Sequence, residues 1–548
     1  DLHVLGDRHQ RPTHLLDETA QDVRIAARML RRQPGFTLAV TCTVALGLGA
    51  SAAVFSIVNA ILLRPLPYAE AGRLVHVVET IPAAESVTGS PQRTATMNMS
   101  EFVEWRARAT TVSHAAVRKP AAMTFITPEG AVRLNGTHAS PSLLPMLGIQ
   151  PVRGRLFELR HEQSGSEKVV LLGYAAWQAY FDSDPDVIGR PIVLDDDPYS
   201  VIGVMPQGFR FFPDLEPAFW IPLATDAAPG GFQRLEVVAR LADGASVEAA
   251  ATEARTIFAA LRGYEPGEPG PVIDVVGWQD ELVAPIRPAL LVFVGAVSLV
   301  LMIACLNVVN LFLARSNARR QELAVRISLG AGRGRIVRQF LAEALLLTVI
   351  SAAAALGVAF AGIRFLQTTA QPLARSDLTR LDAAGSTIPR LNEIAVDGPV
   401  VLYTLMLALV AGALFAIAPA LRAWRTYRLD GGASSAWPSE AGLLASRNLL
   451  VLCQVSLTVV LLAGAGLLIR SFVELTRVEV GYDASEVVTF QTIPGAFGPA
   501  AQDERARRFL EDLMVRLEAL PEVQTAAFTS GLPMVQSKFM LNLGSGTE

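Results

Sequence analysis

Five long stretches without a charged side chain constrain this chain more than any other feature. A hydrocarbon core about 30 Å thick offers no hydrogen-bond partner to the backbone, so roughly 20 consecutive apolar residues cross it as a helix. Buried helices of soluble proteins are usually shorter and carry charges, so we set that alternative aside. The sequence therefore predicts transmembrane helices at residues 36–63, 288–314, 344–363, 399–421 and 448–469.

The composition agrees with a membrane protein and argues against a nucleic-acid partner. Hydrophobic residues make up 51% of the 548-residue chain, charged residues only 18%, and the mean hydropathy is +0.37. These values lie outside the usual range of soluble domains. The formal net charge of −4 gives no general attraction to a polyanion.

Arginines flank the predicted spans unevenly, and cytoplasmic flanks are usually the basic ones. Arginines cluster before the first span, between the second and third, and between the fourth and fifth. We therefore place residues 1–35, 315–343 and 422–447 in the cytoplasm. The remaining connections, 64–287, 364–398 and 470–548, then lie outside it, although the second of these balances four arginines against four acids.

Three asparagines, Asn59, Asn307 and Asn310, place strongly polar groups inside the predicted spans. They could line a solute path or hydrogen-bond a neighbouring helix. No charged relay accompanies them, which favours helix–helix hydrogen bonds. Small residues such as Gly49 and Gly412 also favour close helix packing.

The long segment 64–287 is less apolar and is predicted to form an α+β domain. Asp195 to Pro198 predicts a hairpin turn, with Asp favouring the turn and Pro setting its φ. Residues 246–263 predict an amphipathic helix that Ser246 caps and Gly263 ends. Strand candidates are residues 73–79, 122–127, 167–173, 190–195, 199–205 and 234–241.

The motif search favours neither an enzyme nor a resident cofactor or metal. The sequence has no H-E-x-x-H, G-x-S-x-G, C-x-x-C or calcium-loop pattern. Scattered histidines without a second ligand at useful spacing are more often structural or surface residues than catalysts or metal ligands. This applies to His76, His114, His138 and His161.

The basic segment RRQELAVRISLGAGRGRIVRQF, residues 319–340, joins the second and third predicted spans. It is not a P-loop, because it lacks the Lys-Ser/Thr pair and continues into a membrane span. Two interpretations remain from the residues alone. The segment either rests on anionic lipid or forms an amphipathic helix that offers one face to a soluble partner.

A family resemblance favours the second interpretation. Residues 321–347, QELAVRISLGAGRGRIVRQFLAEALLL, resemble the motif that follows the second span of MacB/FtsX-type ABC-transporter permeases, with Ser328 at a position where the family usually has Ala. The resemblance implies a coupling helix docked on a separate ATP-binding ABC subunit, so ATP is expected on that partner. It implies that Gln339 and Glu343 support the helix, and it assigns coupling to Glu322, Arg326, Leu329, Gly330 and Ala331.

Two further stretches resemble the same family. Residues 184–211 are similar to the end of the family's periplasmic core domain, and the region around the first span resembles the duplicated orphan permeases first noticed in acidobacteria. Residues 481–491, GYDASEVVTFQ, parallel residues 67–79 after the first span. We therefore expect 470–548 to be an incomplete second periplasmic core domain with a helix at 505–520 and a strand at 523–530.

The resulting hypothesis is an α-helical inner-membrane permease subunit with a cytoplasmic N-terminus and an α+β extracytoplasmic domain. It would transmit ATP-driven motion to that domain, for export or for mechanical signalling, and would contact membrane lipid and possible periplasmic or outer-membrane partners. The competing hypothesis is an ATPase-independent scaffold or signalling protein. The sequence indicates neither cargo nor oligomeric state.

Overall fold

The computed structural model describes most of the chain, and the helices and strands below belong to those residues. The described residues are 21, 24–82, 92–94, 97–128, 130–211, 216–225, 235–263, 271–318, 333–375, 390, 393–429, 440–476, 488, 502–521 and 523–527. The chain separates into two compact units. The helical unit contains described residues of Asp1–Arg64, Ala284–Gln371 and Arg390–Arg477, and the α/β unit is built mainly from Pro65–Val283.

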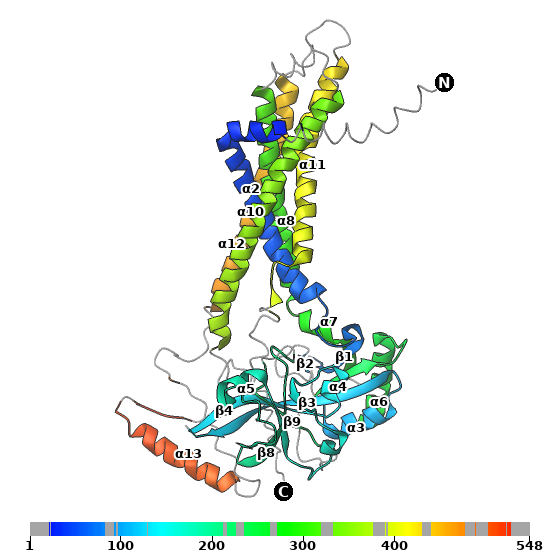
Figure 1. Cartoon of the computed structure of the whole chain (residues 1–548), viewed down its shortest axis with the longest axis vertical. Helices are drawn as coiled ribbons and strands as arrows, with labels where there is room; N and C mark the ends of the chain where they lie inside the picture. Colours follow the sequence, from blue (N-terminus) through cyan, green and yellow to red (C-terminus); the bar gives the residue numbers. More distant parts are fainter. Residues whose placement is uncertain are drawn as a thin grey trace. The chain divides into compact units, whose positions relative to one another are not determined.

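Five helices of the helical unit are long and apolar enough to cross a membrane, which confirms the predicted five spans. In Figure 1 they run side by side as a bundle. The first helix ends in one π-helical turn, η1, over Asn59–Leu63. The five helices are α2 (Pro34–Val58, continued by η1), α8 (Arg287–Ala318), α10 (Arg333–Arg375), α11 (Gly398–Leu429) and α12 (Glu440–Thr476).

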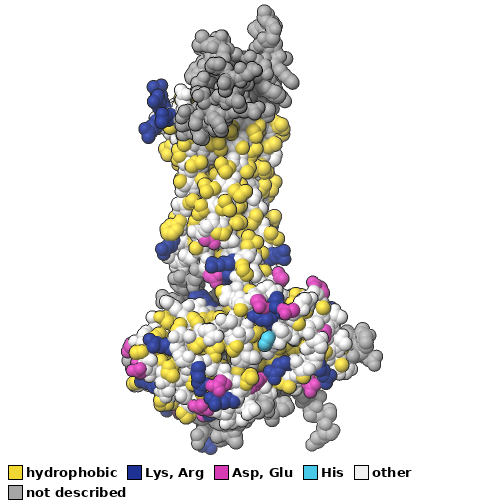
Figure 2. Space-filling model, turned by 45° about the vertical axis from the view of Figure 1, so that its right-hand side comes forward, with side chains coloured by type: hydrophobic (Ala, Val, Ile, Leu, Met, Phe, Trp, Pro, Cys, Tyr) yellow, Lys and Arg dark blue, Asp and Glu magenta, His cyan; other side chains and the backbone are white. Residues whose placement is uncertain are grey.

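Small residues let the bundle pack closely, as the sequence predicted. A Cβ on Gly49 would lie 2.9 Å from the side chain of Val358, and one on Gly412 would lie 2.7 Å from Thr348 Oγ1. Contacts this short leave no room for a larger residue, so glycine allows α2 to approach α10 and α10 to approach α11. Outside this packed interior, Figure 2 shows hydrophobic side chains covering the bundle as a broad belt.

The α/β unit is built around one mixed sheet with strand order β11-β1-β10-β3-β4-β9-β6-β8-β5. The pairs β4–β9 and β6–β8 are parallel, and the other pairs along this order are antiparallel. All six candidate strands occur. The strands are β1 (Leu74–Ile81), β2 (Gln92–Thr94), β3 (Val112–Thr127), β4 (Gly130–Ala139), β5 (Arg153–Gly154), β6 (Val169–Leu172), β7 (Pro191–Leu194), β8 (Asp197–Val204), β9 (Phe219–Pro222), β10 (Glu236–Leu241) and β11 (Val272–Gly277).

One helix packs on this sheet through its apolar face, with Ala250, Ala251, Ala254 and Phe258 in one core with residues of β1, β3, β10 and β11. The capped helix predicted at residues 246–263 is α6 (Val247–Arg262). The Ser246 side chain accepts a hydrogen bond from Ala249 N, and Gly263 ends the helix with φ of 70°. Both cap predictions are therefore confirmed. The other helices of this unit are α3 (Met99–Arg108), α4 (Leu143–Met146), α5 (Tyr174–Phe181), α7 (Trp278–Val283) and α13 (Gln502–Glu518).

The predicted hairpin between β7 and β8 exists, but its turn chemistry differs from the prediction. Asp195 and Asp196 take the two central positions, with φ of 49° and 66°. Two successive positive φ values define a type I′ turn, which matches the twist of paired strands. Pro198 instead lies inside β8, opposite Val193. The aspartates therefore form the turn by themselves.

The C-terminal expectations have a mixed outcome. The expected helix is present as α13, whereas described residues 523–527 of the expected strand form no strand. A strand requires a neighbour to accept and donate its backbone hydrogen bonds. No described residue pairs with 523–527.

Candidate coupling and transmission sites

The predicted coupling segment joins α8 to α10. Glu322, Arg326, Leu329, Gly330 and Ala331 lie outside the described residues, between Ala318 and Arg333. Their assignment therefore stays a prediction. The described helix ends on either side of the segment do carry a specific arrangement of side chains.

A buried ion pair joins α8 to α10 where the two helices flank this segment. The guanidinium Nη1 of Arg315 contacts the carboxylate Oε1 of Glu343, and both side chains are at most 10% exposed. The Arg315 guanidinium carbon also lies 4.2 Å from the ring centre of Phe36, in a cation–π contact with the start of α2. Removing one partner of a buried pair leaves an uncompensated charge, so the contact holds the two helix ends together.

Aromatic rings extend this contact to a fourth helix. Phe36 meets Phe312 of α8 edge-on at 5.6 Å, and Phe312 stacks on Phe415 of α11 at 6.2 Å. Phe312 and Phe415 are almost fully buried. Residues from α2, α8, α10 and α11 therefore meet in one cluster, which we call the basal cluster: Phe36, Phe312, Arg315, Glu343 and Phe415.

The connection between α10 and α11 fastens the end of α2 within the same unit. The Arg390 guanidinium donates a 2.6 Å hydrogen bond to the backbone oxygen of Arg64, just beyond the π-helical turn. Asn59 Nδ2, within that turn, donates to Asp397 Oδ2 at 3.1 Å. Asp397 also accepts from Val400 N at the start of α11. For Asn59, the predicted hydrogen bond to a neighbouring helix is thus confirmed, at the residue that directly precedes α11.

In the α/β unit, the two points where the chain connects to membrane helices meet in one aromatic stack. Tyr68 follows the end of α2 in sequence, and Trp278 precedes α8. Their rings stack at 5.0 Å and 13°, and Phe211 contacts Trp278 at 4.9 Å. The Tyr68 hydroxyl donates to the backbone oxygen of Arg210 at 2.9 Å. A displacement of either connection must therefore move the other or break this stack.

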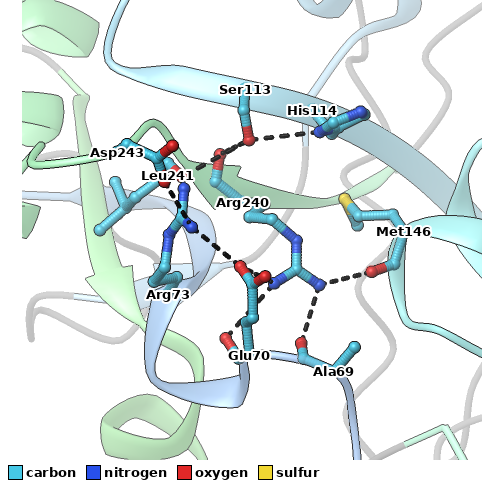
Figure 3. A network of polar contacts seen from close by, with 9 residues as sticks. All are labelled: Ala69, Glu70, Arg73, Ser113, His114, Met146, Arg240, Leu241 and Asp243. Atoms are coloured by element: carbon cyan, nitrogen blue, oxygen red, sulfur yellow. Dashed lines mark hydrogen bonds and ion pairs between the residues drawn. The ribbon is translucent and has the colours of Figure 1, made fainter.

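Arg240 of β10 fixes the first of these connections to the sheet (Figure 3). Its guanidinium donates to Ala69 O at 2.8 Å, to Glu70 Oε2 at 3.0 Å and to Met146 O. The Arg240 side chain is only 9% exposed. Arg73 pairs with Glu70 and Asp243 beside it, in a more exposed position. The buried Arg240 guanidinium thus donates hydrogen bonds to two separate segments. One is Ala69 and Glu70, where the chain enters the domain, and the other is Met146.

His138 and Glu253 are among the acid–base groups of the α/β unit whose pKa values the structure displaces. Burial, supported by the Lys119 ammonium, lowers the pKa of His138 to about 4. Burial alone would raise the pKa of Glu253, but hydrogen bonds from Thr110 and Thr111 outweigh it and lower that pKa to about 2. Thr110 donates from both N and Oγ1, at 2.9 and 2.6 Å.

The predicted structural role fits two further histidines. His76 of β1 pairs with Glu281 of α7, and His161 Nδ1 accepts from Glu158 N at 2.9 Å. Within the described ranges no three His, Cys, Asp or Glu side chains are grouped to hold a metal ion.

Sequence reasoning missed the basic residues that organise these contacts. In the sequence, Arg315 is an ordinary flank charge, Arg390 a loop charge and Arg240 a charge within a strand candidate. The clearest sequence signal concerned Arg315. It directly follows one uncharged span, while Glu343 directly precedes the next, so two opposite charges border one short connection. The backbone oxygens that Arg240 and Arg390 contact are more than 90 residues away in sequence, and no local pattern reveals them. The carboxylate partner of Arg390, Glu393, is only three residues away.

These features define a class: a multi-pass membrane protein whose helical bundle continues in sequence into an α/β domain. The MacB-like periplasmic core domain family matches residues 37–257, and the FtsX-like permease C-terminal family matches residues 294–427. The chain thus carries both domains of the MacB/FtsX-type ABC permeases, and its five apolar helices imply a multi-pass inner-membrane protein of that family.

Curated relatives carry related names. The chain is 25% identical over 218 residues to the macrolide export ATP-binding/permease protein MacB of Neisseria meningitidis, covering 39% of this chain and 33% of that protein. It is 25% identical over 283 residues to the pyoverdine export ATP-binding/permease protein PvdT of Pseudomonas savastanoi pv. phaseolicola, covering 50% and 39%. The chain therefore aligns with about a third of the length of these relatives.

Solved structures of the same kind also align with the chain. The periplasmic region of MacB from Actinobacillus actinomycetemcomitans aligns with a TM-score of 0.31 at 14% identity, covering 40% of this chain and 94% of that one. The extracellular domain of the noncanonic ABC-type transporter YknZ from Gram-positive bacteria aligns with a TM-score of 0.30 at 14% identity, covering 37% and 99%.

Proposed function

We propose that this permease transmits motion from a separate ATP-binding ABC subunit to its α/β unit. In this proposal the partner subunit binds residues 319–332 in the cytoplasm, and ATP hydrolysis displaces that segment. The bundle carries the displacement across the membrane to the α/β unit outside. The names of the curated relatives, which join ATP-binding and permease functions, support the proposal.

The observation that carries the proposal is the Arg315–Glu343 ion pair. A flexible connection between α8 and α10 would absorb a push on the segment between them. A buried pair beside that segment makes the two helix ends move together. Through Phe36, Phe312 and Phe415, the same displacement reaches α2 and α11.

The α/β unit suits the receiving end of such a motion. The stack of Tyr68 on Trp278 couples the two chain connections, and Arg240 anchors one of them to the central sheet. Interfaces and packed cores transmit small shifts because they do not deform continuously. We propose that the α/β unit changes its contacts with an extracytoplasmic partner or cargo in response.

A pull-down from native membranes tests the ATPase partner. The tagged full chain should co-purify with an ABC ATPase, and Glu322→Lys or Gly330→Trp should remove it. Ser328→Ala, which introduces the residue usual in the family, is the matched control and should retain it. A clean complex without any nucleotide-binding chain would refute the proposal and favour the scaffold hypothesis.

Cysteine labelling tests the orientation. Cys42, Cys305 and Cys453 are first replaced, and a single cysteine is then placed at Ser328 or at the exposed Ser164. A reagent that cannot enter intact cells should modify the cysteine at position 164 after outer-membrane permeabilisation and should spare position 328. The opposite pattern would place the segment outside the ATP-containing compartment and overturn the proposal.

A further inference from the structure

A short helix before α2 carries four arginines that take no part in the coupling and transmission sites. It covers residues 24–32, directly before the break at Gln33 and Pro34. Ala26 and Leu30 on this helix are 1% and 4% exposed, and Leu30 belongs to the core of the bundle. The four exposed arginines are Arg24, Arg28, Arg31 and Arg32.

The arginines form one face of this helix, and the buried residues form the opposite one. Positions i, i+4, i+7 and i+8 share one side of a helix with 3.6 residues per turn. Residues 24, 28, 31 and 32 have that spacing. Ala26 and Leu30, also four residues apart, are displaced by about half a turn from them. The basic face therefore points away from the bundle, not into it.

The helix is fastened in this orientation. Thr37 Oγ1 of α2 donates to Leu30 O at 2.9 Å, and Gln33 N donates to the same oxygen at 3.3 Å. Pro34 prevents the short helix from running straight into α2 because it lacks the backbone N–H that the helix would need there. In Figure 1 the dark-blue short helix lies across the end of α2. The arginines consequently keep a fixed position relative to the span.

That position lies at the margin of the hydrophobic belt. Figure 2 shows a group of Lys and Arg side chains projecting sideways at one end of the belt. Among the residues that the structure describes, none of the four arginines forms an ion pair with a carboxylate. Lipid headgroups occupy this level beside any helix that spans the hydrocarbon core.

We propose that this basic face is a binding site for anionic phospholipid headgroups. Arginine forms planar, paired hydrogen bonds with phosphate oxygens, and basic residues next to a span attract anionic lipid. The sideways direction of the face favours lipid over a soluble protein partner, which would approach from beyond the end of the bundle. The site does not depend on coupling to an ATPase.

Lipid retention measured by native mass spectrometry tests the site. The full chain is reconstituted in nanodiscs that contain equal amounts of phosphatidylglycerol and phosphatidylcholine. After the protein is released from the nanodisc, the molecules of each lipid that remain bound to it are counted. We expect an excess of phosphatidylglycerol. Replacing all four arginines by Gln should lower the ratio of bound phosphatidylglycerol to bound phosphatidylcholine at least about fivefold. Loss of the attraction between one basic residue and an anionic surface already corresponds to that factor.

Two control variants keep this test specific. The Arg→Lys version of the four substitutions preserves the charge and should keep most of the excess. Gln at four exposed arginines of the α/β unit lowers the net charge equally and should leave the lipid ratio unchanged; these are Arg153, Arg155, Arg160 and Arg190. Unchanged helical circular dichroism establishes that the variants are folded.

Two results would overturn the proposal. The wild-type chain could retain both lipids equally, or the four-Gln variant could keep its phosphatidylglycerol excess. In the second case, loss of the ATP-binding subunit from the four-Gln variant in the pull-down would assign the face to a protein partner instead.

Discussion

The ion pair between Arg315 and Glu343 gives a sharp quantitative prediction. Glu343 is 3% exposed and Arg315 10%, so neither charge can recover its hydration when the other is removed. Removing one partner of such a pair typically costs about 3–5 kcal/mol, whereas replacing both by apolar residues of similar volume is often nearly neutral. We expect Glu343→Met and Arg315→Met each to lower the free energy of unfolding by about 3 kcal/mol.

The double variant distinguishes an ion pair from two independent packing contributions. With both charges removed, the loss should be smaller than either single loss, which gives a coupling energy of about 3 kcal/mol or more. The Phe36 contact adds a separate cation–π contribution of about 2 kcal/mol at most to the Arg315 variants. Arg470→Met, at an exposed arginine of α12, is the control and should change the free energy by less than about 0.5 kcal/mol.

Thiol labelling reports unfolding of the bundle itself. Cys305 of α8 is partly buried against the bundle core, so it serves as the probe once Cys42 and Cys453 have been replaced. The full chain in detergent is titrated with denaturant, and the labelled fraction of Cys305 gives the unfolding midpoint. If the losses of the two single variants simply add in the double variant, the ion pair does not hold α8 and α10 together.

Three further predictions concern the α/β unit and are measured by urea unfolding of the full chain, followed by tryptophan fluorescence or, for the Trp278 variants, circular dichroism. Trp278→Ala should cost about 3–5 kcal/mol because the side chain is 1% exposed, whereas Trp278→Phe should cost less than about 2; equal losses would argue against the stack. Arg240→Met should cost about 3 kcal/mol, but Arg73→Met, in a more exposed pair, less than about 1; the reverse order would contradict the anchoring role. The folded-state pKa of His138 is about 4 and its usual value is 6.5, so the unfolded chain binds more protons between these values, and stability should fall by up to about 3 kcal/mol as the pH drops from 6.5 to 4. His138→Asn should reduce this slope and leave the part due to the lowered pKa of His161, exposed His114→Asn should leave it unchanged, and measurements above pH 4.5 avoid the separate loss due to Glu253.

The sequence was sufficient to predict those elements that interactions between neighbouring residues determine. Uncharged stretches long enough for a bilayer predicted the five helices, because lipid leaves the backbone no other solution. Ser246 and Gly263 predicted the ends of α6, because capping involves only neighbouring residues. The turn at Asp195 and Asp196 was located correctly, while its φ values and the place of Pro198 were not.

The sequence by itself determined a membrane bundle interrupted by an α+β segment, through hydropathy, charge flanks and turn residues. Only the tertiary structure decided which charged side chains are buried and which groups they bind. Arg240 and Arg390 resemble any other strand or loop arginine in sequence, yet both are buried against backbone oxygens from distant segments. The physical reason is that a buried cation requires partners that converge in three dimensions, and that convergence is a property of the folded chain.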